Sequence, residues 1–165
     1  MVSIGQISTP DDCAAVRGLV LEFVAWANTQ DPDAQTAPTF KDLEAELDGL
    51  PGIYAPPTGS FLLATNNGRP AGCVAFREHD RDTVELKRMY VRPDQRGGGI
   101  GSRLVQELVA VARAQGRKRI VLDSYHTMTG AHEIYRAAGF RDVAAPEGFP
   151  RHYVGRVIFM EMSLL

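Results

Sequence analysis

The sequence predicts an α/β fold with a mixed, mainly antiparallel sheet of about seven strands and about four flanking helices. Three runs rich in apolar and β-branched residues, at 61–65, 71–76 and 83–91, are separated only by short turns, which indicates an antiparallel meander. The third run is followed by a helical stretch at 100–114 and an apolar run at 120–122. A strand–helix–strand crossover of this length places its two strands in parallel.

Composition points to one ordinary globular domain. The 165 residues are enough to bury a full core, so a single domain over 1–165 is expected. No run approaches 18 apolar residues and no basic region precedes an apolar run at the N-terminus, so no membrane association and a cytoplasmic location are expected. The net charge of −2 gives no reason to expect nucleic-acid binding. Cys13 and Cys73 fit two small buried residues better than a disulfide or a metal pair.

The segment before the meander is expected to hold one strand and two helices. A short strand at 2–7 leads to Thr-Pro-Asp-Asp at 9–12, where a capping hydroxyl, a proline and two acids are typical of a helix start. The helix keeps an apolar face as far as Ala27, and polar residues with two prolines are expected to break it over 28–38. A second helix is expected at 39–50, before a loop.

The remaining elements follow from turn chemistry and periodicity. Asn-Asn-Gly-Arg at 66–69 predicts a tight hairpin turn inside the meander. After the crossover, an apolar stripe predicts a helix at 127–138 and a strand at 140–143. An irregular excursion at 144–153 precedes a closing strand at 157–162.

The strongest functional signal is a glycine-rich turn between the strand at 83–91 and the helix at 100–114. The strand stops before Pro93, and the helix begins directly after the glycines. Free backbone N–H groups and the positive end of the helix dipole therefore face any ligand in the turn, and Arg96 adds a full charge. An anionic ligand is expected here.

Two familiar glycine-rich loops fit this turn poorly or only in part. A P-loop needs a lysine directly after its last glycine, and none follows Gly101. The dinucleotide fingerprint is nearly matched by Gly97-x-Gly99-x-x-Ser102, and Asp123 lies about 20 residues on, where that fold carries its ribose-binding acid. Against the fingerprint, the preceding strand carries charged residues, unlike a strand buried on both faces.

A third pattern, Arg/Gln-x-x-Gly-x-Gly/Ala between a strand and a helix, fits residues 96–101. It resembles the pyrophosphate loop of the GNAT N-acetyltransferases, which bind acetyl-coenzyme A. A second block over 131–140, Ala-x-x-Ile-Tyr-x-x-x-Gly-Phe, is similar to that family's Ala-x-x-Leu-Tyr-x-x-x-Gly-Phe, with Ile134 in place of leucine. The resemblance covers 61–162 and implies the GNAT fold, in which the strand before the loop splays from its parallel neighbour in a V.

The resemblance also implies where acetyl-CoA lies. The coenzyme occupies the V-shaped gap, with its pantetheine arm along the backbone of Met89, Tyr90 and Val91 and its pyrophosphate beside Arg96. The N–H groups around the pyrophosphate belong to the loop and the first helical turn: Gly97, Gly98, Gly99, Ile100, Gly101 and Ser102. Glycines let the backbone approach the phosphates closely. No metal is expected.

By the same resemblance, Tyr135 stands where the family places the acid that protonates the departing thiolate, and a phenol is protonated at neutral pH. Packing in the core is the alternative. Glu85 stands where some members carry the base that takes the amine proton. The alternative is a strand ion pair with Lys87 or Arg119.

Strict alternation places Glu85 on the same face as Met89 and Val91, and the sequence leaves open which face looks into the cleft.

Further residues are weaker candidates. Asp123, His126 and Glu78 could serve as the base or recognise the amine, since ligands of open α/β sheets gather at strand ends. His132 is expected to face solvent. Trp26 and Tyr54 either wall the acceptor site or pack in the core or at its rim.

These features favour an acetyl-CoA-dependent N-acetyltransferase that transfers the acetyl group directly to a primary amine of a small molecule, with peptide or protein amines next. Neither cysteine lies in either block, which disfavours a covalent acyl-enzyme. The alternatives are a non-catalytic acyl-CoA sensor and, more distantly, a dinucleotide-binding oxidoreductase. The sequence leaves open whether the chain forms a homodimer.

Overall fold

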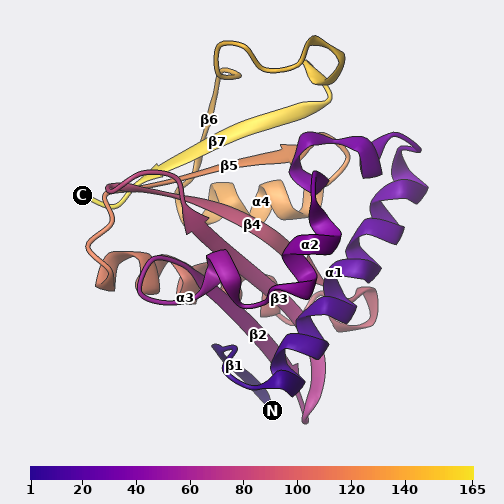
Figure 1. Ribbon diagram of the computed structural model, residues 1–165, viewed down its shortest axis with the longest axis vertical. Coiled ribbons are helices and arrows are strands. Elements are labelled where there is room, and N and C mark those ends of the chain that lie inside the picture. The colour runs from indigo at the N-terminus through magenta and orange to yellow at the C-terminus, as the bar shows by residue number, and fades with distance from the viewer.

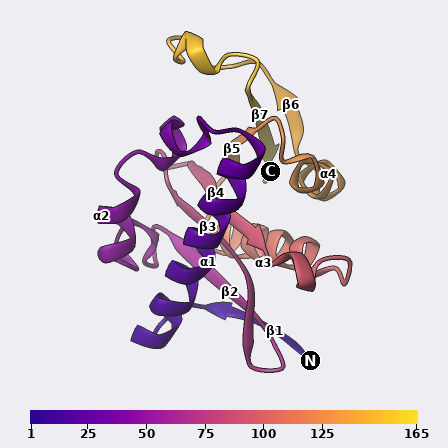
Figure 2. The same ribbon diagram turned by 90° about the vertical axis from the view of Figure 1, so that its right-hand side faces the viewer.

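The computed structural model describes residues 1–165, which form a seven-stranded sheet with helices on both faces. Helices α1 (Pro10–Gln30) and α2 (Leu43–Asp48) cover one face, and α3 (Ile100–Ala114) and α4 (Thr129–Ala138) cover the other (Figures 1 and 2). The predicted fold class is confirmed. The strands are β1 (Val2–Gln6), β2 (Ser60–Asn66), β3 (Arg69–Glu78), β4 (Thr83–Val91), β5 (Arg119–Tyr125), β6 (Arg141–Val143) and β7 (Val157–Ser163).

The sheet has the order β1-β2-β3-β4-β5-β7-β6, and only β4 and β5 run parallel. The predicted meander and the parallel crossover are therefore both present. Strands β2 and β3 are joined by the expected tight turn, in which Asn67 (φ 50°) and Gly68 (φ 79°) both adopt the left-handed conformation of a type I′ hairpin.

The parallel pairing between β4 and β5 is short. It begins at Thr83↔Arg119 and ends at Glu85↔Val121, whereas β5 continues to Tyr125 paired only with β7. Beyond Glu85 the two strands diverge, and Figure 1 shows them separating from a common start. The sheet thus contains the predicted V-shaped splay, which we call the fork.

Helix α1 begins as predicted. The Asp12 N–H donates to the Thr9 hydroxyl (3.1 Å), and the Thr9 N–H donates to the Asp12 carboxylate (3.0 Å), which forms a capping box. The expected break at 28–38 was wrong in position, because α1 continues to Gln30. Polar residues do not end a helix whose outer face is in solvent, and the first proline of that segment is Pro32.

The helix expected at 39–50 is shorter than predicted. A 3₁₀ turn at Pro38–Phe40 and the short α2 replace it, and Asp42 lies between them with φ 58°. A residue in the left-handed conformation interrupts the run of helical hydrogen bonds. Phe40 and Leu47 are nevertheless buried, as their spacing predicted.

Two apolar cores lie on the two faces of the sheet. One packs residues such as Leu104 and Leu108 of α3 against the strands, and the other packs Val16 and Leu19 of α1. The charged β4 lies between the two cores and contributes side chains to both. Measured by length and apolarity together, none of the helices could span a membrane.

Candidate functional site

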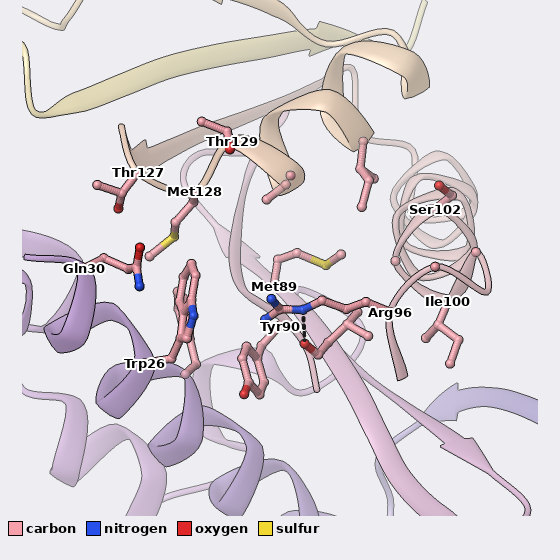
Figure 3. Close-up of a pocket in the computed structure, with 18 residues that line it drawn as sticks. Trp26, Gln30, Met89, Tyr90, Arg96, Ile100, Ser102, Thr127, Met128 and Thr129 are labelled. Atoms are coloured by element: carbon pink, nitrogen blue, oxygen red, sulfur yellow. Dashed lines mark hydrogen bonds between the residues drawn. The ribbon is translucent and has the colours of Figure 1, made fainter. Parts of the chain in front are cut away.

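A cavity of about 580 Å³ lies at the open end of the fork. Figure 3 shows that its walls come from α1, from the end of β4, from the start of α3 and from the turn into α4. The lining residues are Phe23, Trp26 and Gln30 of α1, Met89, Tyr90 and Val91 of β4, Arg96, Gly97, Gly99, Ile100, Gly101 and Ser102 of the loop and α3, and Thr127 to Ala131 with Ile134 around α4.

The glycine loop presents unpaired donors to this cavity. A 3₁₀ turn at Pro93–Gln95 ends β4, and Gly97 (φ 84°) and Gly99 (φ 80°) then adopt left-handed conformations that turn the chain into α3. Gly99 is the N-cap of α3 and offers no side chain to cap it. The N–H groups of residues 97–102 have no hydrogen-bond acceptor in the protein, so they are available to an anion.

Most residues predicted to contact the coenzyme line the cavity. The exception is Gly98, which is exposed and lies outside the lining. Gly101 has a role that the sequence did not indicate: a Cβ there would lie 2.8 Å from Ile134 Cδ1 and 3.2 Å from Met89 Cε. Its small size therefore allows α3 to approach α4 and β4 closely.

Arg96 lies across the mouth of the cavity. Its Nε donates to the carbonyl oxygen of Val91 (2.8 Å), the contact dashed in Figure 3. The guanidinium carbon is 5.4 Å from the ring centre of Trp26 and 5.8 Å from that of Tyr90, which places the cation over both rings. Arg96 thus occupies part of the cavity between the loop and the β4 backbone.

Strand β4 corrects one argument from the sequence. Its charged residues were expected to keep it from being buried on both faces, but only 7% of Lys87 and 4% of Arg88 are exposed. Burial is possible because the charges are paired. Arg88 makes two hydrogen bonds to Glu46 of α2 (2.8 and 3.0 Å), and Lys87 Nζ lies 3.4 Å from Glu85.

A β-bulge corrects the predicted alternation along β4. Cys73 of β3 pairs with Tyr90 while Ala75 pairs with Lys87, so β4 carries one extra residue between them. Arg88 adopts φ 60° in this bulge. Met89 and Val91 consequently face the core under α3, whereas Glu85 lies on the opposite face, and the expectation that all three share a face was wrong.

Glu85 faces a second cavity of about 430 Å³, lined by Ile53, Thr58, Arg77, Glu78, His79 and Glu85. Its carboxylate is ion-paired with Arg77 (3.2 Å) and Lys87 (3.4 Å). Burial acts to raise the pKa of Glu85, but the positive charges of Lys87 and Arg77 outweigh burial and lower it. The structure therefore contains the ion pair that was the alternative for this residue.

Tyr135 is 3% exposed and packs beside Phe140, with ring centres 5.7 Å apart. It does not itself line the large cavity, although Ala131 and Ile134 on the same helix do. Burial and the negative charge of Asp123 raise the pKa of the phenol, so Tyr135 is protonated at neutral pH.

The second-rank candidates are scattered. Asp123 is half-buried on β5 beyond the last pair of the fork. His126 is exposed, and Glu78 pairs with Arg117 (2.7 Å) at the second cavity. His132, expected in solvent, is only 4% exposed, and its Nε2 lies 2.9 Å from the Ser124 hydroxyl. The correction follows from helical periodicity, since His132 lies four residues after Met128 on the inner side of α4.

The sequence missed the wall contributed by α1. Phe23 and Gln30 line the cavity together with Trp26, and their spacing of three and four residues places them on one helical face. That spacing could have identified them, but the helix was expected to end before Gln30. Of the two aromatic candidates, Trp26 lines the cavity, whereas Tyr54 is fully buried in the core.

Comparison with known proteins gives one family match. Residues 21–140 match the model of the acetyltransferase (GNAT) family. The matched span includes the second half of α1, the glycine loop and all of α4.

Individual relatives agree with this match. An uncharacterized N-acetyltransferase of Schizosaccharomyces pombe is 28% identical over 165 residues, which cover 99% of this chain and 95% of that protein. Human N-acetylaspartate synthetase is 34% identical over 114 residues, covering 68% of this chain but only 36% of the synthetase. A Salmonella typhimurium acetyltransferase solved with acetyl-CoA superposes with a TM-score of 0.69 at 20% identity, covering 100% of this chain and 95% of that one.

Proposed function

The chain belongs to the acetyltransferase (GNAT) family, and on that premise we propose that it binds acetyl-CoA in the fork and transfers the acetyl group directly to a primary amine of a small molecule. The observation that supports this proposal most strongly is the row of unpaired N–H groups at 97–102, which borders a cavity that ends in the fork. Solved relatives of the same fold, such as the Salmonella acetyltransferase, hold acetyl-CoA.

The residues around the cavity fit this co-substrate. The donors at 97–102 suit a pyrophosphate, and the open conformations of Gly97 and Gly99 leave room for it, since nothing lies within 4 Å of a Cβ built at either residue. The edge of β4 beyond Glu85 has no strand partner on the β5 side. Backbone groups of Met89 and Val91 on that edge would hold the pantetheine arm, as a neighbouring strand would.

Arg96 must move for that arm to bind. Its Nε occupies the Val91 carbonyl, which is one of the groups assigned to pantetheine. Released from Val91, the guanidinium is at the lip of the loop, where it can form a charge-assisted hydrogen bond with the pyrophosphate. Arg96 therefore exchanges one oxygen acceptor for a charged one when the coenzyme enters.

Groups of this chain can assist each step of the acetyl transfer in turn. Acetyl-CoA supplies an acetyl group activated as a thioester. The Met89 N–H stabilises the negative charge that develops on the carbonyl oxygen when the amine attacks, an effect of about 3 kcal/mol for one donor. As the C–N bond forms and the C–S bond breaks, Tyr135 gives its proton to the thiolate.

Two observations favour a small acceptor over a protein. The loop between β6 and β7 is tied to the segment that follows α1, through Arg156 to Asp31 (2.5 Å) and through the hydroxyls of Tyr153 and Thr36 (2.9 Å). These contacts hold the two loops together next to Gln30, a residue of the cavity wall, which leaves less room for a large substrate on that side. N-acetylaspartate synthetase, whose name states a small amide product, is among the relatives. Peptide and protein amines are the second class.

A thiol-release screen tests the proposed function. With acetyl-CoA and a panel of amino acids, diamines, polyamines and short peptides, we expect at least one primary amine to accelerate release of free thiol and to gain an acetyl group by mass spectrometry. The matching tertiary amine of each active compound is the control, because it cannot form a neutral amide. Tight acetyl-CoA binding without thiol release from any amine would support the sensor, and absence of binding would refute the proposal altogether.

A further inference from the structure

The acceptor amine needs a base, and Glu85 is poorly placed for that role. Its carboxylate neutralises Lys87, whose side chain is 5% exposed, and it also pairs with Arg77. It lines the second cavity, together with Arg77. A carboxylate held between two cations is a weak proton acceptor.

Asp123 has the opposite surroundings. It follows the last β4–β5 pair by two residues, so it lies where the two strands begin to separate. Its side chain is on the same face of β5 as Val121 and Tyr125, and its neighbour across β7 is the apolar Phe159. No cation lies within 4.0 Å of its carboxylate, and the carboxylate accepts no side-chain hydrogen bond.

Asp123 lies at the point where β4 and β5 separate, and it lines neither of the two cavities. Glu85 lines the second cavity, Met89 and Tyr90 line the cavity in the fork, and Lys87 lies between them on β4. Lys87 and Asp123 each follow the last β4–β5 pair by two residues, so the register places them opposite each other in the fork, and their charges act on each other's pKa. On the proposed function the thioester lies in the fork, and Asp123 is the carboxylate without an ion pair at the end of the fork where the two strands meet.

The charged groups around Asp123 determine when it can accept a proton. Burial raises the pKa of Asp123, the charge of Lys87 lowers it and that of Glu85 raises it; a hydrogen bond from its own N–H and the charge of Arg88 lower it further. Arg88 is itself paired with Glu46, and the charge of Asp123 acts on the phenol of Tyr135 in α4. The net shift is upward, so Asp123 is a better proton acceptor than an exposed aspartate.

We infer that Asp123, rather than Glu85, receives the acceptor as a cationic primary amine and takes its proton; this inference rests on the proposed function. The proton passes from the ammonium nitrogen to an Asp123 Oδ, and the freed lone pair forms the C–N bond. The C–S bond then breaks, its electron pair remains on sulfur, and Tyr135 protonates that sulfur. The nitrogen loses its second proton to solvent as the neutral amide forms, and Tyr135 takes a proton back from solvent. Asp123 releases its own proton to solvent before the next cycle.

The base and the acid are coupled in this arrangement. The negative charge of Asp123 raises the pKa of Tyr135 in the resting protein. Protonation of Asp123 by the substrate removes that charge, so the phenol becomes a stronger acid in the step in which the thiolate departs. Glu85 lacks this link, because its charge does not contribute to the raised pKa of Tyr135.

The test compares Asp123→Asn, Glu85→Gln and the surface control Asp142→Asn in the full chain, with acetyl-CoA and the most active amine of the screen. We expect Asp123→Asn to lower kcat about 10²-fold or more and to flatten the acidic limb of the pH–rate profile. Glu85→Gln should keep that limb. Asp142 pairs with Arg136 on the surface, so its variant should match wild type in rate.

Thermal unfolding gives a second readout that needs no active amine. A carboxylate whose pKa is raised by folding stabilises the native state below its unfolded pKa, and this contribution is lost as pH rises through the folded pKa. At pH 8 we therefore expect Asp123→Asn to have a Tm at or above that of wild type. Glu85→Gln leaves Lys87 buried without its partner and should lower Tm by several degrees.

Each outcome separates this inference from the proposed function. An active wild type whose acidic limb survives in Asp123→Asn but not in Glu85→Gln would overturn the inference alone. A Tm for Asp123→Asn well below that of wild type at pH 8 would do the same, since Asp123 would then be a structural ion-pair partner. A wild type that acetylates no amine would refute the proposed function, whatever the Tm of the variants.

Discussion

Replacement of Tyr135 by phenylalanine is expected to lower kcat by about 10²–10⁴-fold, the range for loss of a positioned acid. The substitution keeps the ring, its packing beside Phe140 and the core under α3 and α4. It removes only the proton that the departing thiolate needs. Affinity for acetyl-CoA should barely change, because the hydroxyl acts on charge that develops as the thioester breaks.

Tyr54→Phe provides the matched control for this variant. Tyr54 is fully buried, its hydroxyl has no hydrogen-bond partner, and burial raises the pKa of its phenol as it does for Tyr135. Tyr54→Phe should therefore leave kcat unchanged. Acetyl thioesters that release a more acidic thiol need the proton less, so they should restore part of the rate of Tyr135→Phe and leave the rate of Tyr54→Phe unchanged. Steady-state kinetics measure both rates. Wild-type turnover by Tyr135→Phe on acetyl-CoA would show that Tyr135 only packs in the core.

Gly99→Val is expected to weaken acetyl-CoA binding more than about tenfold, which corresponds to about 1.4 kcal/mol. Gly99 has φ 80° at the start of α3, and a β-branched residue strains that conformation. The loop then loses the arrangement of N–H groups that faces the pyrophosphate, and the new side chain adds bulk beside it. Trp26, the only tryptophan, lines the same cavity, so its fluorescence can follow the titration alongside calorimetry.

Gly116→Val separates lost binding from lost stability. Gly116 follows the other end of α3 with φ 76°, and, as at Gly99, nothing lies within 4 Å of a Cβ built there. The two variants thus carry a similar backbone strain at opposite ends of one helix. Gly116→Val should share the loss of Tm but keep wild-type affinity for acetyl-CoA. Equal affinities of wild type and Gly99→Val would place the pyrophosphate elsewhere.

The features that could be predicted from the sequence depend on local signals. The proline after β4, the glycine run and the apolar stripe of α3 lie next to one another in the chain, and they indicate the loop without knowledge of the rest of the fold. The parallel pair β4–β5 followed from the length of the crossover. For the same reason, nine of the ten residues assigned to the coenzyme line the cavity, Gly98 being the exception.

The features that were missed depend on partners far away in the chain. Arg88 can be buried in a bulge because Glu46 of α2 binds it, and neither the bulge nor that partner is visible in the strand's own sequence. The bulge reverses the face of Met89 relative to Glu85, which changes the interpretation of both residues. The isolation of Asp123 follows from how far the β4–β5 pairing extends, which the apolar pattern does not specify.

A crystal structure of the chain with coenzyme A tests the central claim most directly. We expect the pyrophosphate to accept hydrogen bonds from the N–H groups at 97–102, and Arg96 to have left the Val91 carbonyl. The sulfur should lie in the fork, between the Met89 backbone and the Tyr135 hydroxyl. A pyrophosphate bound away from the loop, or a sulfur outside the fork, would contradict the account.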